Sequence, residues 1–244
     1  MIYNQIKPHP DLVDYIDAFW IAEGEGEELK KVCILPDGCM DLISNLGDDL
    51  KTANGTFAMH SGKSYLVGTM TVSQDSFLRS ENKLLGVRFK PAAFSSFYNY
   101  VPLHEITDKV IDFEQSLSPD VGKLRHHDFS YLNTYFLNRI NRPKHRLAPV
   151  INDIYIAGGQ IIIDKLAKMN ATTVKQLERD FKKHVGISPK EFVNIVRFQS
   201  VIKLIKQNQL GRSLLDIAYE NGYYDHAHLT NSIKRYTGQV PSQL

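Results

Sequence analysis

The chain has 244 residues, of which 43% are hydrophobic and 23% are charged, and its formal net charge is +2. These values are typical of an ordinary soluble globular protein with one or two domains. No apolar run reaches the ~20 residues of a membrane span, the N-terminus lacks the apolar core of a signal peptide, and the two cysteines are too few for a disulfide framework. We therefore expect a cytoplasmic protein that does not act at a membrane.

The first part of the chain, up to about residue 115, has the short apolar runs of a strand-rich domain. Two such runs in residues 32–46 flank Pro36-Asp37-Gly38, which is a favourable turn sequence. Further strands are expected at residues 65–70, 76–79 and 84–89, with a polar loop at residues 51–62. Pro91 can occupy the first position of a helix. Several strands and one helix predict a small barrel or a cupin-like curved sheet, and the pattern does not distinguish the two.

The segment of residues 118–142 changes to helical spacing of its apolar side chains, which are Leu132, Tyr135, Phe136 and Ile140. It runs into residues 141–149, a basic stretch with a proline near each end and the best linker in the chain. We place the domain boundary there, giving an N-terminal domain of residues 1–142 and a C-terminal domain of residues 143–244. The helical segment is expected to couple the domains or to form a dimer contact, unless it only closes the first domain.

The two sides of this boundary differ in charge. Residues 144–244 hold 15 Lys and Arg against 8 Asp and Glu, whereas residues 1–143 hold 14 against 19. A basic part beside an acidic part suits a nucleic-acid-binding module joined to a module of another kind. The same charge also fits an ordinary solvated surface, so it does not decide the question alone.

Helix starts are well marked in the C-terminal part. Thr173, Ser188 and Ser213 each place a hydroxyl at a possible N-cap, with an amide or acidic side chain three residues later. Pro189 follows Ser188 at the favoured first helical position. The helix that starts there is expected to cover residues 189–206, which corresponds to roughly 27 Å. That length suits a spacer between two recognition helices, because successive major grooves lie ~34 Å apart.

The C-terminal part also repeats one small unit, first from Asp164 and again from Asp216. Each copy has a short apolar helix that carries an alanine, a polar break, and a second helix with apolar residues four apart. A basic pair, a glycine and an X-Pro dipeptide then follow. This is the layout of a helix-turn-helix, whose second helix lies in the DNA major groove. We therefore predict an α+β protein whose C-terminal domain is all-α, with two helix-turn-helix units joined by a long helix.

Each recognition helix has a polar outer face. The first would present Lys175, Glu178, Arg179, Lys182 and Lys183, and the second would present His226, Ala227, Thr230, Asn231, Lys234 and Arg235. Arginine can bind guanine in bidentate fashion, glutamate can accept from cytosine, and asparagine pairs with adenine. Alternatively, Arg179 forms an ion pair with Asp180 or Glu178, and the basic pairs are ordinary solvated charges. His228 is expected to have a structural or capping role.

These residues carry a resemblance. The segment of residues 147–244 resembles the DNA-binding domain of the AraC/XylS family of bacterial transcription regulators. The matching positions are Leu177, Arg179, Phe181, Lys182, Gly186, Ser188 and Pro189 in the first copy, and Asp216, Ile217, Ala218, Gly222, Tyr223, Lys234, Arg235, Gly238 and Pro241 in the second. The resemblance implies a transcription regulator that binds double-stranded DNA and is not an enzyme.

Departures from the family pattern fall mostly in the second copy. The family's usual Gln, Phe and Arg in the last recognition helix stand here as His226, Leu229 and Asn231, another Phe as Ile233, and the threonine before the final proline as Val240. We therefore expect the second helix to contact DNA weakly or mainly through phosphates. The first helix, with Lys175 and Arg179, is the better candidate for reading sequence.

The N-terminal part resembles an uncharacterised domain that occurs on a subset of AraC-like regulators. The resemblance rests on Trp20, the Pro36-Asp37-Gly38 turn with Asp41 after it, and residues 86–91. It implies a role in sensing or dimerisation, without naming a ligand. The candidate effector-binding residues are Trp20, Asp37, Asp41 and Arg88, and the alternative is a structural ion pair beside an ordinary turn.

Other chemistry finds little support in the sequence. Cys33 and Cys39 flank the turn and could form a redox or catalytic thiol site, but we expect two inert, half-buried thiols instead. His60 and His104 are isolated, and the adjacent His126 and His127 would diverge on a helix, so no metal site is expected. No nucleotide-binding or nucleophile motif is present either. We expect no catalytic residue, no cofactor and no enzymatic activity.

The interpretation is a bacterial transcription regulator, an activator, whose partner is double-stranded DNA. An unidentified small effector, a second copy of the chain and RNA polymerase are further candidate partners. The alternatives leave the N-terminal domain as a protein-interaction platform without a ligand, or as a thiol-based catalytic or redox domain.

Overall fold

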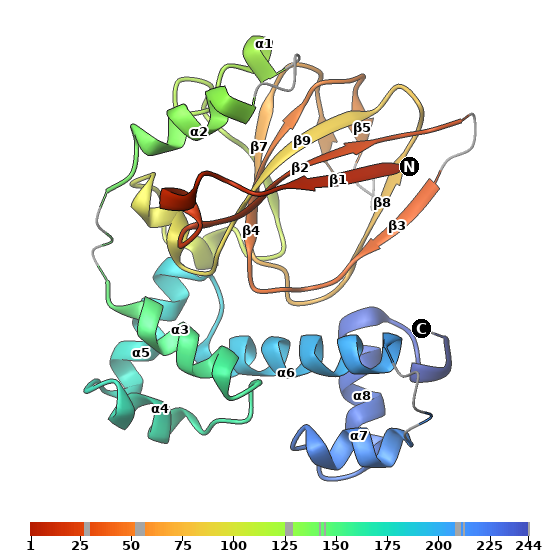
Figure 1. The fold of residues 1–244 in the computed structure, drawn as a ribbon, viewed down its shortest axis with the longest axis vertical. Coiled ribbons are helices and arrows are strands. Elements are labelled where there is room, and N and C mark those ends of the chain that lie inside the picture. The colour runs from red at the N-terminus through yellow and green to blue at the C-terminus, as the bar shows by residue number, and fades with distance from the viewer. Residues whose placement is uncertain are drawn as a thin grey trace.

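The computed structural model describes residues 1–26, 30–51, 57–124, 129–141, 143, 145–207, 211 and 213–243. Strands dominate the N-terminal part and helices make up the C-terminal part, with the long helix α6 (Pro189–Lys206) below the sheets in Figure 1. A strand-rich N-terminal domain followed by a helical domain confirms the predicted α+β class.

The N-terminal part is built on one antiparallel sheet of six strands, in the order β1-β2-β9-β4-β7-β10. Their bounds are β1 Ile2–Ile6, β2 Ile16–Glu23, β9 Lys83–Phe89, β4 Met40–Asn45, β7 Ser64–Val67 and β10 Val110–Asp112. Two smaller antiparallel pairs are formed by β3 (Lys30–Ile34) with β8 (Gln74–Leu78), and by β5 (Leu50–Lys51) with β6 (Ala58–Met59).

Both faces of the large sheet are buried. On one face Phe19, Leu42 and Val87 share a core with Phe136 and other helical side chains. The short helices on this side are η1 (Pro10–Leu12), η2 (Ala93–Ser96), η3 (Leu103–Glu105), α1 (Val121–Leu124) and α2 (Phe129–Leu137). On the other face Trp20 and Leu84 pack with residues of the small sheets, such as Leu78 of β8.

The strands expected at residues 65–70, 76–79 and 84–89 correspond to β7, β8 and β9, and the two runs in residues 32–46 correspond to β3 and β4. The turn at Pro36–Gly38 is present, and Gly38 adopts a φ of +80°. However, it joins strands of different sheets, since β3 pairs with β8 while β4 pairs with β7 and β9.

Other expectations need correction. The strands β1, β2 and β10 have no counterpart in the predicted set. The pair β5–β6 has none either, and it occupies part of the expected loop at residues 51–62. The helix after Pro91 is a short 3-10 helix, and the predicted helical segment of residues 118–142 contains the helices α1 and α2. Residues 52–56 of the expected loop, the pair His126 and His127, and the linker residues Arg142 and Lys144 lie outside the described residues.

The C-terminal part contains the two predicted helix-turn-helix units. The bounds of its helices are α3 Leu147–Ile156, α4 Ile163–Met169, α5 Val174–His184, α6 Pro189–Lys206, α7 Leu214–Glu220, α8 His226–Thr237 and η4 Pro241–Gln243. The units are α4–α5 and α7–α8, and α6 joins them with the predicted 18 residues. Leu177 and Phe181 of the first unit and Leu229 and Ile233 of the second belong to one buried core, so the two units fold as one body.

The three predicted N-caps are all present. The side-chain oxygens of Thr173, Ser188 and Ser213 accept hydrogen bonds from the backbone N–H groups three residues later. A fourth cap is formed by Asp225, which accepts from the N–H of His228 at the start of α8. These bonds satisfy donors that a helix start otherwise leaves free, and they fix where each helix begins.

Replacing Ser188 with alanine is expected to lower the free energy of unfolding by ~1 kcal/mol, because the N–H of Glu191 loses its acceptor at the start of α6. Chemical denaturation monitored by circular dichroism measures this. Ser200→Ala is the matched control on the same helix, since the Ser200 hydroxyl only bonds back to the Val196 carbonyl, an interaction that does not favour the helix. Equal losses in both variants would show that the cap is energetically unimportant.

The two parts of the chain are docked against each other. The hydroxyl of Thr69 donates to the Val185 carbonyl at 2.6 Å, and that of Thr107 donates to the Gly186 carbonyl at 2.7 Å. The Ser73 N–H donates to the Tyr236 carbonyl at 3.1 Å. The apolar clusters change over between Ile140 and Leu147, and on this basis we propose the domain boundary between residues 142 and 143.

A histidine pair lies at the same junction. The rings of His145, in the linker, and His184, at the end of α5, are 4.3 Å apart between centroids. The Nε2 of His145 lies 3.1 Å from the Ala92 carbonyl and 3.0 Å from the Ser95 hydroxyl. Burial lowers the pKa of both imidazoles, to about 4 for His184, whose neighbour His145 lowers it further. Both rings are therefore neutral at pH 7.

Candidate nucleic-acid interface

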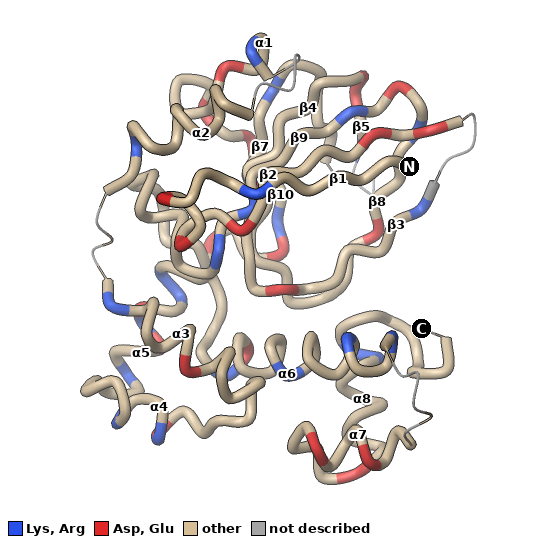
Figure 2. Tube along the Cα trace, in the orientation of Figure 1, with Lys and Arg blue, Asp and Glu red and all other residues tan. Residues whose placement is uncertain are grey.

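The outer face of α5 is basic and open to solvent. Lys175, Arg179, Lys182 and Lys183 are exposed, and Glu178 is partly exposed beside them. Leu177 and Phe181 face the core, with exposed fractions of 2% and 0%. Lys and Arg gather along α4 and α5 in Figure 2, whereas α7 carries Asp and Glu. The first unit is thus the more strongly basic of the two.

The contacts of Arg179 differ from the ion pair considered as an alternative. Its Nη2 donates to the side-chain oxygen of Gln176, and the Gln176 amide donates to both carboxylate oxygens of Asp180, at 2.8 and 2.7 Å. No salt bridge between Arg179 and an acid is found in the part of the chain that the structure describes. This arrangement holds Arg179 on the outer face and leaves the rest of its guanidinium available.

The outer face of α8 is less basic and partly occupied. His226, Ala227, Asn231 and Lys234 are exposed as expected. Arg235 is exposed, but its Nη2 also contacts both carboxylate oxygens of Glu191 at 2.8 Å, which ties α8 to the start of α6. Tyr236 donates to the same carboxylate at 2.8 Å.

Thr230 differs from the expected outward orientation. Its Oγ1 is buried and has no hydrogen-bond partner among the described residues. The reason is its position on the helix: Thr230 follows Leu229 and lies three residues before Ile233, at the edge of the buried stripe. Only part of this side chain can face a ligand.

His228 belongs to the framework of the turn, as predicted. Its backbone N–H donates to the Asp225 carboxylate at 2.7 Å, its Nδ1 accepts from the Tyr224 N–H at 3.4 Å, and its ring meets that of Tyr223 edge-on. These contacts fix the start of α8 and thereby the direction in which its outer face points.

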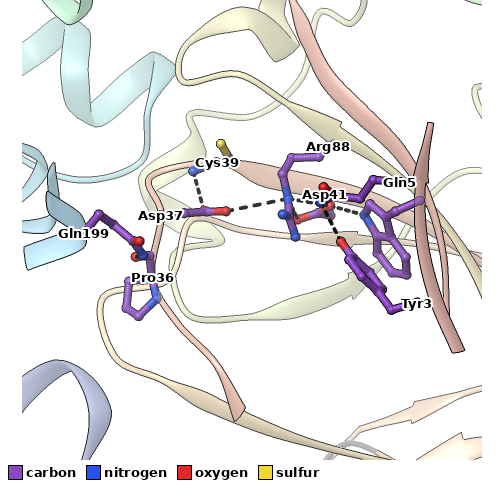
Figure 3. A network of polar contacts seen from close by, with 9 residues as sticks. Tyr3, Gln5, Pro36, Asp37, Cys39, Asp41, Arg88 and Gln199 are labelled. Atoms are coloured by element: carbon purple, nitrogen blue, oxygen red, sulfur yellow. Dashed lines mark hydrogen bonds and ion pairs between the residues drawn. The ribbon is translucent and has the colours of Figure 1, made fainter. Parts of the chain in front are cut away.

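The four candidate effector-binding residues lie together in the N-terminal domain, and Figure 3 labels three of them, Asp37, Asp41 and Arg88. The indole Nε1 of Trp20 donates to Asp41 at 2.6 Å. The Nε of Arg88 lies 3.4 Å from the Asp41 carboxylate and 3.6 Å from that of Asp37. Strand register brings them together, since Asp41 of β4 is the direct partner of Arg88 on β9, and Trp20 is the partner of Gly86.

The electrostatics of this cluster follow from burial. Burial raises the pKa of Asp41 to about 6, although Arg88 and the Trp20 N–H act in the opposite direction. Burial lowers the pKa of Arg88, but Asp41 and Asp37 outweigh this effect and leave it above its ordinary value. Asp37 also accepts from the Cys39 N–H at 2.9 Å. The cluster thus pins the turn before β4 to the large sheet, which is what the structural alternative describes.

Two surface cavities lie elsewhere. One, of about 510 Å³, is lined by residues around Pro119 and Tyr131. The other, of about 430 Å³, lies at the junction of the two parts, between aromatic side chains such as Phe94 and Tyr98 and the end of α5 at Lys183 and His184.

The structure also bears on the thiol, metal and membrane alternatives. Cys33 is exposed and Cys39 is partly buried, and both thiols are free. Burial raises the pKa of Cys39 well above its ordinary value, which opposes formation of a reactive thiolate. Within the described ranges, no group of three or more His, Cys, Asp or Glu side chains could hold a metal ion. None of the described helices is long and apolar enough to cross a membrane.

Comparison with protein families agrees with the duplicated unit. Residues 166–244 match a helix-turn-helix domain family, and this segment contains both recognition helices, α5 and α8. Ahead of this segment, residues 4–112 match a family described as a domain of unknown function, DUF6597.

Curated proteins are similar to part of this chain. An uncharacterized HTH-type transcriptional regulator from Haemophilus influenzae is 40% identical over 81 residues, which are 33% of this chain and 26% of that protein. Thermoregulatory protein LcrF from Yersinia pestis is 32% identical over 122 residues, which are 47% of this chain and 42% of that protein. The matched segments thus span less than half the length of these relatives.

A solved structure extends the similarity to the fold of both domains. The structure of ToxT from Vibrio cholerae at 1.65 Å resolution superposes on 92% of this chain and 97% of its own, with a TM-score of 0.52 and 13% sequence identity. The fold, a strand-rich domain followed by a helical domain, is therefore shared.

Proposed function

We propose that the protein is a transcription regulator that binds double-stranded DNA through both helix-turn-helix units, reading two successive major grooves. The observation that carries this proposal is the pairing of two recognition helices, α5 and α8, on one common core, joined by the 18-residue α6. A rigid pair of such helices is suited to two grooves on one side of a duplex, because their separation is fixed before DNA is met.

In this proposal α5 makes more of the DNA contacts than α8. On α5, Arg179 and Lys175 read bases, Glu178 accepts from a cytosine amino group, and Lys182 and Lys183 bind phosphates. On α8, the exposed His226, Ala227 and Asn231 face the bases and Lys234 binds phosphate. Because the Thr230 hydroxyl is buried and Arg235 is paired with Glu191, these two residues contribute less than their sequence positions indicate.

The N-terminal domain is proposed to control DNA binding through a small effector or through dimerisation. ToxT, whose fold is similar, has also been solved with an unsaturated fatty acid bound, in a structure with a TM-score of 0.50 and 13% identity to this chain. This supports small-molecule control as a class without identifying the molecule. Trp20, Asp37, Asp41 and Arg88 remain the proposed effector-responsive residues.

The turn before β4 is the proposed route of control. On one side Asp37 contacts Arg88, as described above. On the other side the side-chain amide of Gln199, on α6, donates to the Pro36 carbonyl (Figure 3), and the ring of Phe192 lies against Gly38. A ligand that competes for Asp37 or Arg88 would therefore shift the turn on which α6 rests.

Activation of transcription in the cytoplasm is the proposed outcome, with RNA polymerase as the protein partner. A relative from Yersinia enterocolitica, 32% identical over 122 residues that form 47% of this chain and 42% of that protein, is named as the virulence regulon transcriptional activator VirF. This supports activation over repression.

Recovery of bound fragments from bacterial genomic DNA, with the purified protein at near-physiological salt, tests the proposal. The expected motif has two boxes separated by about one helical turn, or 10–10.5 base pairs. A single box would show that only one unit reads sequence. Absence of enrichment, with and without extracts of small metabolites, would contradict the proposed function.

Arg179→Ala is expected to weaken binding to the recovered motif by ~1–3 kcal/mol and to relax the preference at one base position. The reason is loss of a bidentate contact to a base edge. Lys182→Ala is the matched comparison, since loss of a phosphate contact should weaken all sequences alike and reduce the salt dependence. Fluorescence anisotropy with single-base variants of the motif measures both. Unchanged binding by Arg179→Ala would mean that another face of α5 meets the DNA.

A further inference from the structure

A single side chain in the middle of α6 contacts both helix-turn-helix units. The Nε and Nη2 atoms of Arg197 both donate to the Gly159 carbonyl, at 3.0 and 2.8 Å, and its Nη1 donates to the Gly222 carbonyl at 3.4 Å. Gly159 lies in the loop that leads into α4 of the first unit, and Gly222 lies in the turn between α7 and α8 of the second. One guanidinium therefore bridges the two.

The backbone on the side of the first unit is shaped for this contact. Gly159 adopts a φ of +70°, and a Cβ added there would lie 2.4 Å from the Val193 carbonyl oxygen and 2.6 Å from the Arg197 nitrogen. The loop thus rests directly on α6, at a distance that only glycine permits. This close approach places the Gly159 carbonyl within reach of two Arg197 donors.

The contact on the side of the second unit leads to its recognition helix. The Arg197 guanidinium lies over the ring of Tyr223, 5.7 Å from its centroid. Tyr223 is 5% exposed, and its hydroxyl is 3.2 Å from that of Ser232 on α8. A change in the position of Arg197 would therefore be passed to α8 through a buried aromatic ring.

The same two segments also meet without α6. The side-chain amide of Gln160 donates to the Glu220 carbonyl at 3.0 Å, across the gap between the loop before α4 and the end of α7. Gln160 and Arg197 thus hold the two units together at neighbouring points, one exposed and one partly buried.

We propose that Arg197 is a positioning residue that sets the angle and separation of the two recognition helices, and thereby the spacing of the DNA boxes that the protein accepts. The shared apolar core keeps the units together, but apolar contacts are not directional and tolerate small rotations. The planar fork of arginine has fixed donor directions and resists them. The inference rests on the proposed two-box recognition and names its spacing determinant.

The experiment uses the full chain and the two-box duplex recovered with the wild-type protein, together with duplexes in which one or two base pairs are added or removed between the boxes. The wild-type protein is expected to lose at least about tenfold in affinity on each such change, since misplacement removes contacts in one groove. Arg197→Ala is expected to bind the original duplex about tenfold more weakly and to differ less than about threefold among the spacings, because the rigid coupling of contacts is lost.

Two further variants separate positioning from general effects. Lys203→Ala removes another cation from α6, one for which the described residues show no ion pair, and should keep the wild-type spacing profile. Gln160→Ala removes the exposed bridge and should broaden the profile partially while leaving the fold intact. It decides the question if Arg197→Ala does not fold, as judged by circular dichroism.

The outcomes are distinguishable from failure of the proposed function. If the wild-type protein binds no two-box duplex, the proposed function fails. If it does, and both Arg197→Ala and Gln160→Ala keep its sharp dependence on spacing, the apolar core alone fixes the units and the inference is overturned.

Discussion

Replacing Phe192 with alanine is expected to destabilise the protein by ~3–5 kcal/mol, the largest effect we anticipate for a single side chain. Phe192 is 0% exposed. Its ring centroid lies 5.7 Å from that of Phe181 and 5.8 Å from that of Tyr155, and a Cβ on Gly38 would come within 2.5 Å of its Cε2. Truncation would leave a cavity at the point where the C-terminal domain meets the turn before β4.

Chemical denaturation gives the free energy directly, and Tyr219→Ala on the exposed surface of α7 is the control. Tyr219 is 60% exposed, so its replacement should change stability by less than about 0.5 kcal/mol. A loss of less than about 1 kcal/mol in Phe192→Ala would mean that the ring is not enclosed. Because Phe192 touches both domains, we further expect the variant to unfold with separate transitions for the two domains instead of one.

The second large effect concerns pH. In the folded protein the pKa of Asp41 is about 6, above the ordinary value of about 3.9 expected in the unfolded chain. The folded state therefore binds more protons between these values, and the contribution of Asp41 to stability falls as pH rises from about 4 to about 6. At higher pH this carboxylate costs the fold up to about 3 kcal/mol relative to its protonated form. Asp41→Asn removes this dependence while keeping an acceptor for the Trp20 N–H.

His184 contributes to the pH dependence of stability with the opposite sign to Asp41. Its folded-state pKa of about 4 lies below the ordinary value, so the unfolded chain binds the extra proton and stability is lost as pH falls from about 6.5 to about 4. The contributions of Asp41 and His184 to the wild-type profile therefore have opposite slopes in this window. Asp41→Asn should therefore lose stability on acidification more steeply than the wild type, and His184→Gln less steeply.

Thermal unfolding between pH 4 and pH 8 measures both slopes. Parallel curves for the wild type and Asp41→Asn would show that Asp41 stays ionised throughout, and would contradict the burial argument. In the double variant both contributions are absent, so the slope of its profile should lie between those of the two single variants.

The helices of the C-terminal domain could be predicted from the sequence because the interactions that define them join residues close together in the chain. Ser188 and its partner N–H are three residues apart, and the apolar residues of each recognition helix are four apart, so the sequence itself contains both members of each interaction. The boundaries of α6 and the outer face of α5 could therefore be predicted. Thr230 was misplaced because it stands at the edge of the apolar stripe, where helical periodicity does not decide between inside and outside.

The strands of the N-terminal domain were harder to predict from the sequence because the large sheet is buried on both faces. In β2, Phe19 faces the helices and Trp20 faces the small sheets, so apolar and polar residues do not alternate. The turn at Pro36–Gly38 was recognisable, but no local signal indicates that it passes from one sheet to another. Strand pairing over long separations is a property of the whole fold and not of the segment.

For the proposed effector residues, too, the residue types could be predicted from the sequence but their arrangement could not. Trp20, Asp41 and Arg88 could be chosen as unusual residue types, and strand register places them together. What the sequence could not indicate is that they form a closed network beneath the turn on which α6 rests. Nor did it indicate the Arg197 bridge, because Gly159 and Gly222 take part through backbone carbonyls that any residue carries.

Three of the bonds between the domains share that property, and it bears on how such a protein can change over evolution. Thr69, Thr107 and Gln199 each donate from a side chain, but the acceptors are the carbonyls of Val185, Gly186 and Pro36. Each of these three bonds therefore depends on residue identity at one end only. Substitutions at the acceptor positions that preserve the backbone path leave the three bonds intact, so these positions can vary without a matching change in the other domain.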